Sequence, residues 1–205
     1  MVAAGGDGTI SEVMNGLARA TPAGETVGKL GILPLGTGND FADIIGCQRN
    51  LFEAAQLIGR GRTRRVDLGY AKIVGPDIQR DRYFDNNMGV GFEAHVTLES
   101  YSVKWLSGVS LYVVAALKSL RSYHAPQVEM SWEDEGGRLQ HHSQRVLLVT
   151  VGNSPRTGGG FYLTPDALLD DGLLDIGILD NVSRWRILGL LPKALKAHTP
   201  TILRS

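Results

Sequence analysis

The sequence lacks the features that mark several large classes of protein. Its single cysteine, Cys47, excludes a disulfide framework, and its five histidines show no zinc-ligand spacing with that cysteine. No apolar run approaches the roughly 18 residues of a membrane span, and no basic-then-apolar leader is present. The 21 basic residues balance the 21 acidic ones, so no charge excess attracts nucleic acid. Composition therefore predicts a soluble, cytoplasmic protein that does not bind nucleic acid.

Glycine, in contrast, is abundant, and residues 5–9 (GGDGT) form a glycine-rich turn ahead of a segment with apolar residues at helical spacing. Glycine lets the backbone approach a ligand closely, and the N-terminus of the following helix offers unpaired N–H groups to an anion. Thr9 and Glu12 have the spacing of a capping box, which predicts Thr9 as the helix cap. The pattern is typical of a phosphate site, and it also fits an ordinary strand-to-helix turn.

A second glycine-rich turn follows in residues 33–42 (LPLGTGNDFA). Residues 31–35 predict a short buried strand, and Asn39 or Asp40 can cap the helix that comes next. Neither turn continues into the Gly-Lys-Ser/Thr of a P-loop, so phosphates would be bound by backbone N–H groups, helix ends and a metal ion. Two such turns at the carboxyl edge of a parallel sheet predict an α/β nucleotide site.

The hydrophobic pattern changes near Arg65. Residues 1–64 predict the order helix, strand, helix, helix, with Asn50 and Glu53 placed to cap the last helix. From Arg65 onward apolar residues alternate with period two, which predicts strands near 66–70, 128–132, 146–151 and 174–178. A charged turn is expected at 133–137 and helices at about 105–120 and from 183. We therefore expect an α/β domain over 1–64 and a mostly antiparallel β domain over 65–205.

Five motifs in order resemble the diacylglycerol kinase catalytic domain family, which includes bacterial diacylglycerol and YegS-like kinases and is related to sphingosine and ceramide kinases. They are the two turns and the segments 65–69 (RVDLG), 87–94 (NMGVGFEA) and 158–175, which together span almost the whole chain. The resemblance implies a partial Rossmann-like nucleotide-binding domain followed by an antiparallel β-sandwich, with the active site in the cleft between them. It implies transfer of the γ-phosphoryl group of ATP, with Mg²⁺, to a lipid hydroxyl such as that of diacylglycerol.

The same resemblance gives roles to single residues. It implies that Thr37 touches the nucleotide and that Asn39 and Asp40 order the site. The full implied ATP-binding set is Gly5, Gly6, Asp7, Gly8, Thr9, Glu12, Thr37, Asn39 and Asp40. It further implies a structural Mg²⁺ bound by the Asp171 carboxylate and the main-chain oxygens of Leu168 and Leu173. Without the family, the Asp-Asp-Gly sequence at Asp171 favours simple turn chemistry, and Asp175 reads as an edge residue of the strand.

The chain departs from the family pattern at several points. Family members carry a further strand and phosphate-contacting loop ahead of the first turn, and their proposed base is the aspartate of an Asp-Gly-Glu segment, which would fall beyond Ser205. The resemblance thus implies an internal fragment, with Asp7 as the fallback base. Asp43 stands where bacterial members commonly have arginine, so either another base such as Arg49 compensates near the triphosphate or the local role differs.

Two other functions remain open from the sequence. A kinase of NAD or of a soluble alcohol fits the first turn, since NAD kinases share Gly-Gly-Asp-Gly, and a non-catalytic nucleotide-binding regulatory module fits the absence of a base. A lipid substrate would be met at the inner membrane surface, and a homodimer is compatible with the family. The arginines at 60, 62, 64 and 65 are either a membrane contact or a solvated linker. Residues 89–94 fit a loose dinucleotide pattern, which we interpret as part of the β-rich half.

Overall fold

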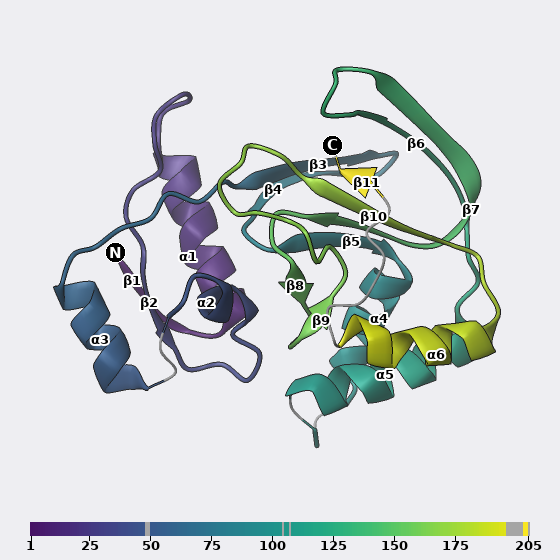
Figure 1. The fold of residues 1–205 in the computed structure, drawn as a ribbon, viewed down its shortest axis with the longest axis horizontal. Coiled ribbons are helices and arrows are strands. Elements are labelled where there is room, and N and C mark those ends of the chain that lie inside the picture. The colour runs from purple at the N-terminus through teal and green to yellow at the C-terminus, as the bar shows by residue number, and fades with distance from the viewer. Residues whose placement is uncertain (48–49, 104, 107, 196–202, 205) are drawn as a thin grey trace. The chain divides into compact units, whose positions relative to one another are not determined.

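The computed structural model describes residues 1–47, 50–103, 105–106, 108–195 and 203–204. The chain divides into two compact units, Met1–Asp85 and Asn86–Ser205, each drawn in Figure 1. No helix within the described ranges is long and apolar enough to cross a bilayer.

Unit 1 begins with two parallel strands joined through a helix. Strand β1 (Val2–Gly5) pairs with β2 (Gly31–Pro34), and α1 (Asp7–Ala20) lies between them in sequence. Gly5 stands opposite Pro34, so both strands end at the same edge. Helix α1 buries Ile10, Met14 and Ala18, one residue per turn, as the apolar spacing predicts.

Helices α2 (Asp40–Ile44) and α3 (Leu51–Gly59) follow, and then the hairpin of β3 (Gly69–Gly75) and β4 (Ile78–Phe84). The buried Asn15 ties this hairpin to α1, because its side chain bonds the backbone N–H and C=O of Tyr83 at 3.0 and 2.9 Å. Arg19 adds an ion pair with Asp81 at 3.1 Å. The change of pattern near residue 65 therefore falls inside unit 1.

Asn50 caps α3 as the sequence predicts. Its Oδ1 accepts hydrogen bonds from the backbone N–H groups of Phe52 and Glu53 at 2.9 and 3.3 Å. Replacing Asn50 with alanine leaves both donors to water, so we expect the free energy of unfolding to fall by about 1 kcal/mol. Asn50→Asp should keep the cap. Urea unfolding of both variants measures the difference, and an alanine variant as stable as the parent would contradict the assignment.

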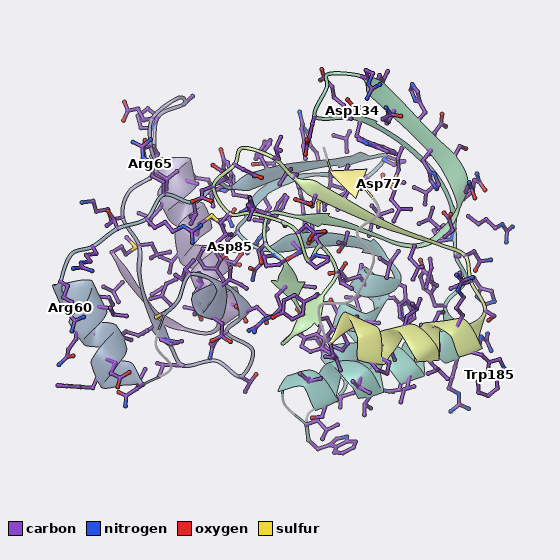
Figure 2. The ribbon with its side chains drawn as sticks, viewed as in Figure 1. Arg60, Arg65, Asp77, Asp85, Asp134 and Trp185 are labelled. Atoms are coloured by element: carbon purple, nitrogen blue, oxygen red, sulfur yellow. The ribbon has the colours of Figure 1, made fainter. Side chains whose placement is uncertain are left out.

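Unit 2 is built on one antiparallel sheet with the strand order β11-β10-β7-β5. Its strands are β5 (Asn87–Gly91), β7 (Leu139–Gly152), β10 (Asp175–Asp180) and β11 (Leu203–Arg204), and β6 (Gln127–Glu133) pairs with the first half of β7. The expected charged turn lies between β6 and β7, where Asp134 can be followed in Figure 2. A small hairpin, β8 (Arg156–Thr157) and β9 (Phe161–Tyr162), encloses the glycines at 158–160.

Three helices pack on the sheet of unit 2: α4 (Phe92–Ser100), α5 (Gly108–Ser122) and α6 (Arg184–Ala194) (Figure 1). Their shared core contains Phe92, Leu120, Leu147 and Ile187. The sequence predicts α5 and α6 but not α4, since Gly91 (φ 84°) turns β5 directly into that helix without a separating loop. The expected combination of α/β structure with antiparallel β structure is confirmed.

Candidate functional site

The two glycine-rich turns meet at the carboxyl ends of β1 and β2. The backbone N–H of Leu35 donates to the carbonyl oxygen of Gly5 at 2.9 Å, which extends the parallel pairing by one residue. Beyond it the backbones of Gly6 and Gly36 touch, because a Cβ atom built on Gly36 would lie 2.4 Å from the Cα of Gly6. Both positions therefore need glycine for close approach, and the two predicted turns lie in direct contact.

Asn39 holds the second turn in shape. Its backbone is left-handed (φ 55°) and the residue is buried, with 3% of its surface exposed. Its Oδ1 accepts from the N–H of Gly36 at 3.0 Å, and its Nδ2 donates to the Gly36 carbonyl at 2.7 Å. Asn39 occupies the N-cap position of α2 as one of the two expected candidates, but its side chain closes the turn and does not cap the helix. Asp40, the other candidate, is the first residue of α2 and is buried.

Asp7 links the two turns. Its Oδ1 accepts a hydrogen bond from the backbone N–H of Phe41 at 3.2 Å, so a side chain of α1 contacts the start of α2. The sequence places Asp7 in the phosphate-binding set, and the structure adds this positional role. Asp7 is also in the first turn of α1, a position that favours a negative charge.

The prediction that Thr9 caps α1 is wrong. The helix begins three residues earlier than expected, at Asp7, with Gly6 in an extended conformation at the N-cap and the N–H of Ile10 bonded to the Gly6 carbonyl at 3.1 Å. Thr9 lies in the first turn, and its side chain packs over Gly5. Gly6 has no side chain that could accept from the first-turn N–H groups, which also lack intrahelical partners. These N–H groups are suited to an anion.

The remaining members of the expected ATP set lie on the surface of this site. Gly8, Thr9, Glu12 and Thr37 are exposed. The Glu12 carboxylate forms an ion pair at 2.7 Å with Arg82 of β4, which also donates to Ser11 Oγ at 3.2 Å. Arg82 was missed by sequence reasoning because it lies 70 residues from Glu12, and no local pattern reveals how the hairpin docks on α1.

Asp43 lies on α2, one turn from Cys47. Burial and the Asp43 carboxylate together raise the pKa of the Cys47 thiol. The negative charge at Asp43 therefore disfavours the ionised form of the neighbouring Cys47 thiol. Arg49, named as a compensating base, lies outside the described residues.

The second expected site, at Asp171, is an exposed turn in unit 2. The Asp171 Oδ1 accepts from the N–H of Leu173 at 3.1 Å, and Gly172 is left-handed (φ 74°), so the turn chemistry is present. Within the described ranges no three His, Cys, Asp or Glu side chains gather as a metal cluster. The expected Mg²⁺ set has one carboxylate and the main-chain carbonyls of Leu168 and Leu173, so it would not count as a cluster of that kind. All of its donors are oxygen atoms, which Mg²⁺ prefers. Asp175 is not an edge residue, since β10 lies between β7 and β11 and Asp175 is 1% exposed.

Unit 2 also contains a buried polar layer that sequence reasoning missed. Asn87, Gly152 and Asp175 lie opposite one another on β5, β7 and β10, and Thr150 lies two residues along on the same face of β7. Thr164 covers Gly152 and accepts from Asn87 Nδ2 at 2.9 Å. The layer depends on strand register, which a single sequence does not reveal.

Glu93 completes this layer from the first turn of α4. Its side chain packs over Gly89, and Thr150 Oγ1 donates to its carboxylate. Although the residue as a whole is half-buried, the carboxyl group is enclosed, and this burial raises its pKa from 4.5 to about 7. The hydrogen bond from Thr150 acts in the opposite direction and is the smaller effect.

The raised pKa of Glu93 predicts a pH-dependent stability. Between pH 4.5 and about 7 the folded chain holds a proton that the unfolded chain releases, so stability falls as the pH rises through this window. We expect a loss of about 3 kcal/mol, which Glu93→Gln should remove while keeping an acceptor for Thr150. Urea unfolding at a series of pH values measures it. The same pH slope in the glutamine variant would assign the effect to other groups.

The chain matches two known domain families, one after the other along the sequence. The diacylglycerol kinase catalytic domain matches residues 1–71, and the YegS C-terminal NAD kinase beta sandwich-like domain matches residues 86–199. The first match contains both glycine-rich turns, and the second contains the polar layer and the Asp171 turn.

Individual relatives agree with these matches. A protein of Pectobacterium atrosepticum named "Probable lipid kinase YegS-like" is 34% identical over 96% of this chain and 60% of its own length. A protein of Bacillus subtilis named diacylglycerol kinase is 33% identical over 97% of this chain and 60% of its own. The crystal structure of a diacylglycerol kinase from Bacillus anthracis str. Sterne superposes with a TM-score of 0.62 at 27% identity, covering 92% of this chain and 57% of that one.

The chain thus spans about three fifths of the length of the curated relatives that it matches. Both glycine-rich turns of unit 1 fall in the first matched region, and strands β5 to β10 of unit 2 fall in the second. The chain therefore belongs to the family of the YegS C-terminal NAD kinase beta sandwich-like domain, and its residues 1–71 match the diacylglycerol kinase catalytic domain.

Proposed function

We propose that this protein transfers the γ-phosphoryl group of ATP to a lipid hydroxyl, with diacylglycerol as the first substrate to test. The observation that carries the proposal is the contact between Gly6 and Gly36, which joins two helix-entry turns at the ends of parallel strands. Such a junction is where α/β proteins bind nucleotides. The names of the Bacillus subtilis and Pectobacterium relatives support a lipid as the acceptor.

In this proposal the backbone of unit 1 binds the triphosphate. The first-turn N–H groups of α1, at residues 7–9, face the phosphates, and Thr37 contacts the nucleotide from the second turn. Asp7 and Asn39 hold the two turns together through the bonds described above. Buried Asp40 orders the start of α2 beside them. Because no P-loop lysine is present, the positioning of the triphosphate and the backbone dipoles would supply more of the transition-state stabilisation.

Magnesium enters the proposal in two places. Bound with ATP, it neutralises charge that develops on the phosphoryl oxygens. A second, structural ion would be held by the Asp171 carboxylate with the main-chain oxygens of Leu168 and Leu173, a donor set of the right chemistry. No general base is assigned in unit 1 or unit 2, and Asp7 is the candidate if the 205 residues alone transfer phosphate.

The cellular setting follows from the substrate. A diacylglycerol stays in the bilayer, so the protein would work in the cytoplasm as a peripheral protein at the inner membrane surface. A homodimer stays a prediction, as do the alternatives of an NAD or soluble-alcohol kinase and of a non-catalytic nucleotide-binding module.

The test is phosphate transfer from γ-labelled ATP, with Mg²⁺, to detergent micelles that contain diacylglycerol, sphingosine or ceramide. The 205-residue chain is compared with the chain plus the sequence that flanks it in its natural gene product. Labelled lipid from the longer form alone supports a lipid kinase whose base lies outside these residues. Labelled lipid from both forms makes Asp7 the base to mutate. ATP binding without labelled lipid from either form rejects the lipid kinase and favours the regulatory module, whereas labelled NAD would favour the NAD kinase.

A further inference from the structure

Basic side chains gather where the C-terminal end of α5 and the N-terminal end of α6 come together in unit 2. Arg184 reaches the carbonyl oxygen of Arg121 at 3.5 Å, and Ile187 and Leu120 pack in the same core beneath them. We call this surface the α5–α6 basic face and define it by Arg121, Arg145, Arg184, Trp185 and Arg186. All five of these residues are exposed.

The charge of this face is not balanced by neighbours in sequence. Residues 108–128 and 181–195, which include both helices, contain no aspartate or glutamate. Asp180, just ahead of this stretch, bonds His142 at 3.0 Å. The whole chain has a formal net charge of zero, so the cations on this face are a local concentration and not an overall excess. A face of this kind attracts an anionic surface.

Trp185 gives the face its second property. Its side chain is flanked by Arg184 and Arg186, is 83% exposed and projects away from the helices (Figure 2). Leaving a tryptophan in water forgoes the burial of a large apolar ring. Tryptophan beside arginine is the combination that favours the head-group level of a bilayer, where the ring is half-buried and the guanidinium meets phosphate.

A cavity of about 260 Å³ opens on the same face. Arg145, Arg184 and His124 line its polar part, and Phe92, Leu147 and Ile187 line its apolar part. The volume is near the lower limit of small-molecule sites, which suits one head group and not a whole lipid. Basic and apolar walls together fit a phosphate ester with its glycerol carbons.

We propose that the α5–α6 basic face docks the protein on an anionic phospholipid bilayer, with Trp185 at the head-group level and a lipid phosphate between Arg145 and Arg184. The inference deepens the proposed function and rests on it in one respect, that a lipid kinase has to reach a membrane. Nucleic acid would also attract the arginines, but the exposed indole and the apolar cavity wall favour lipid. Docking here differs from docking through the arginines at 60, 62, 64 and 65, all of which belong to unit 1.

Vesicle flotation tests the proposal without ATP or diacylglycerol. The chain should float with vesicles of equal parts phosphatidylcholine and phosphatidylglycerol, and high salt should release it. Arg184→Gln with Arg186→Gln should lower its partition coefficient about 30-fold, from two cations near the surface. Arg60→Gln with Arg62→Gln is the matched control, because it removes the same charge from the other cluster and should leave partitioning unchanged. Loss of binding in the control alone would overturn the proposal in favour of the unit 1 arginines.

Fluorescence places Trp185 itself. In a Trp105→Phe, Trp132→Phe background, the remaining tryptophan emission should shift to shorter wavelength on adding anionic vesicles and should not shift with phosphatidylcholine alone. An unshifted emission from bound protein would show that another face docks. Binding to single-stranded DNA but not to vesicles would overturn lipid docking in favour of nucleic acid.

Kinase assays separate this inference from the proposed function. With diacylglycerol in detergent micelles, the Arg184→Gln, Arg186→Gln variant should transfer phosphate at the parent rate, because the micelle removes the need to dock. If the parent transfers phosphate to lipid but does not bind vesicles, the docking face is rejected and the proposed function stands. Vesicle binding with no transfer to any lipid, even by the longer form, would reject the kinase and leave the docking face standing.

Discussion

Gly36→Ala is expected to lower the affinity for ATP by about 100-fold. The new Cβ atom would lie 2.4 Å from the Cα of Gly6 and 2.7 Å from the Oδ1 of Asn39, both of which belong to the site. The first of these contacts is with backbone, so the two turns have to move apart by a large fraction of an ångström. Phosphate binding by backbone N–H groups depends on their placement, and a shift of this size removes it.

The same substitution should also lower the free energy of unfolding by about 1–3 kcal/mol, as overpacking commonly does. Isothermal titration with ATP measures the affinity, and urea unfolding shows how much of the loss is structural. Gly16→Ala is the control, because a Cβ on that residue of α1 meets nothing within 4 Å. It should raise stability by up to about 1 kcal/mol and leave ATP affinity unchanged. A folded Gly36→Ala variant with normal affinity would place the nucleotide elsewhere.

Gly152→Ala is expected to lower the free energy of unfolding of unit 2 by about 4 kcal/mol, the sum of overpacking and a broken buried polar layer. The added Cβ atom would lie 2.0 Å from Thr164 Oγ1 and 2.9 Å from Asn87 Nδ2. Thr164 cannot retreat easily, since it is fully buried and donates to the Ser154 carbonyl at 2.8 Å.

Tryptophan fluorescence in urea measures this loss directly, because Trp105, Trp132 and Trp185 all belong to unit 2. Thr164→Gly in the Gly152→Ala background removes the side chain that causes the clash. The double variant should therefore be more stable than the two single effects predict when added, by at least about 1 kcal/mol. Strict additivity would mean that the two residues do not touch, and that the polar layer is not packed as described.

Much of unit 1 could be read from the sequence because its signals are local. The apolar spacing of α1, the cap at Asn50 and the two glycine-rich turns each depend on residues within a few positions of one another. The prediction of Thr9 as the cap is wrong because of a contact with a residue outside the first turn. Gly6 is fixed in an extended conformation at the end of β1 against Gly36, so the helix begins at once and the capping-box spacing goes unused.

The features that the sequence could not reveal all depend on distant residues meeting. Arg82 reaches Glu12 through the docking of a hairpin, and Glu93 reaches Thr150 through the pairing of β5 with β7. Period-two alternation predicts that a strand exists but not its partner or register. The family resemblance named the motif around Glu93 without saying what its carboxyl group contacts.

The pairing of β5 with β7 also sets an order of assembly. Met88 of β5 pairs with Val151 of β7, and α4, α5 and β6 lie between them in the chain, whereas β6 and β7 are joined by a short turn. Local hairpins close faster than contacts across long loops, so the β6–β7 hairpin should form early and β5 should join late. At a pH between 4.5 and about 7, Glu93 then stays ionised in water until β7 arrives and buries it, and folding takes up a proton at its last step.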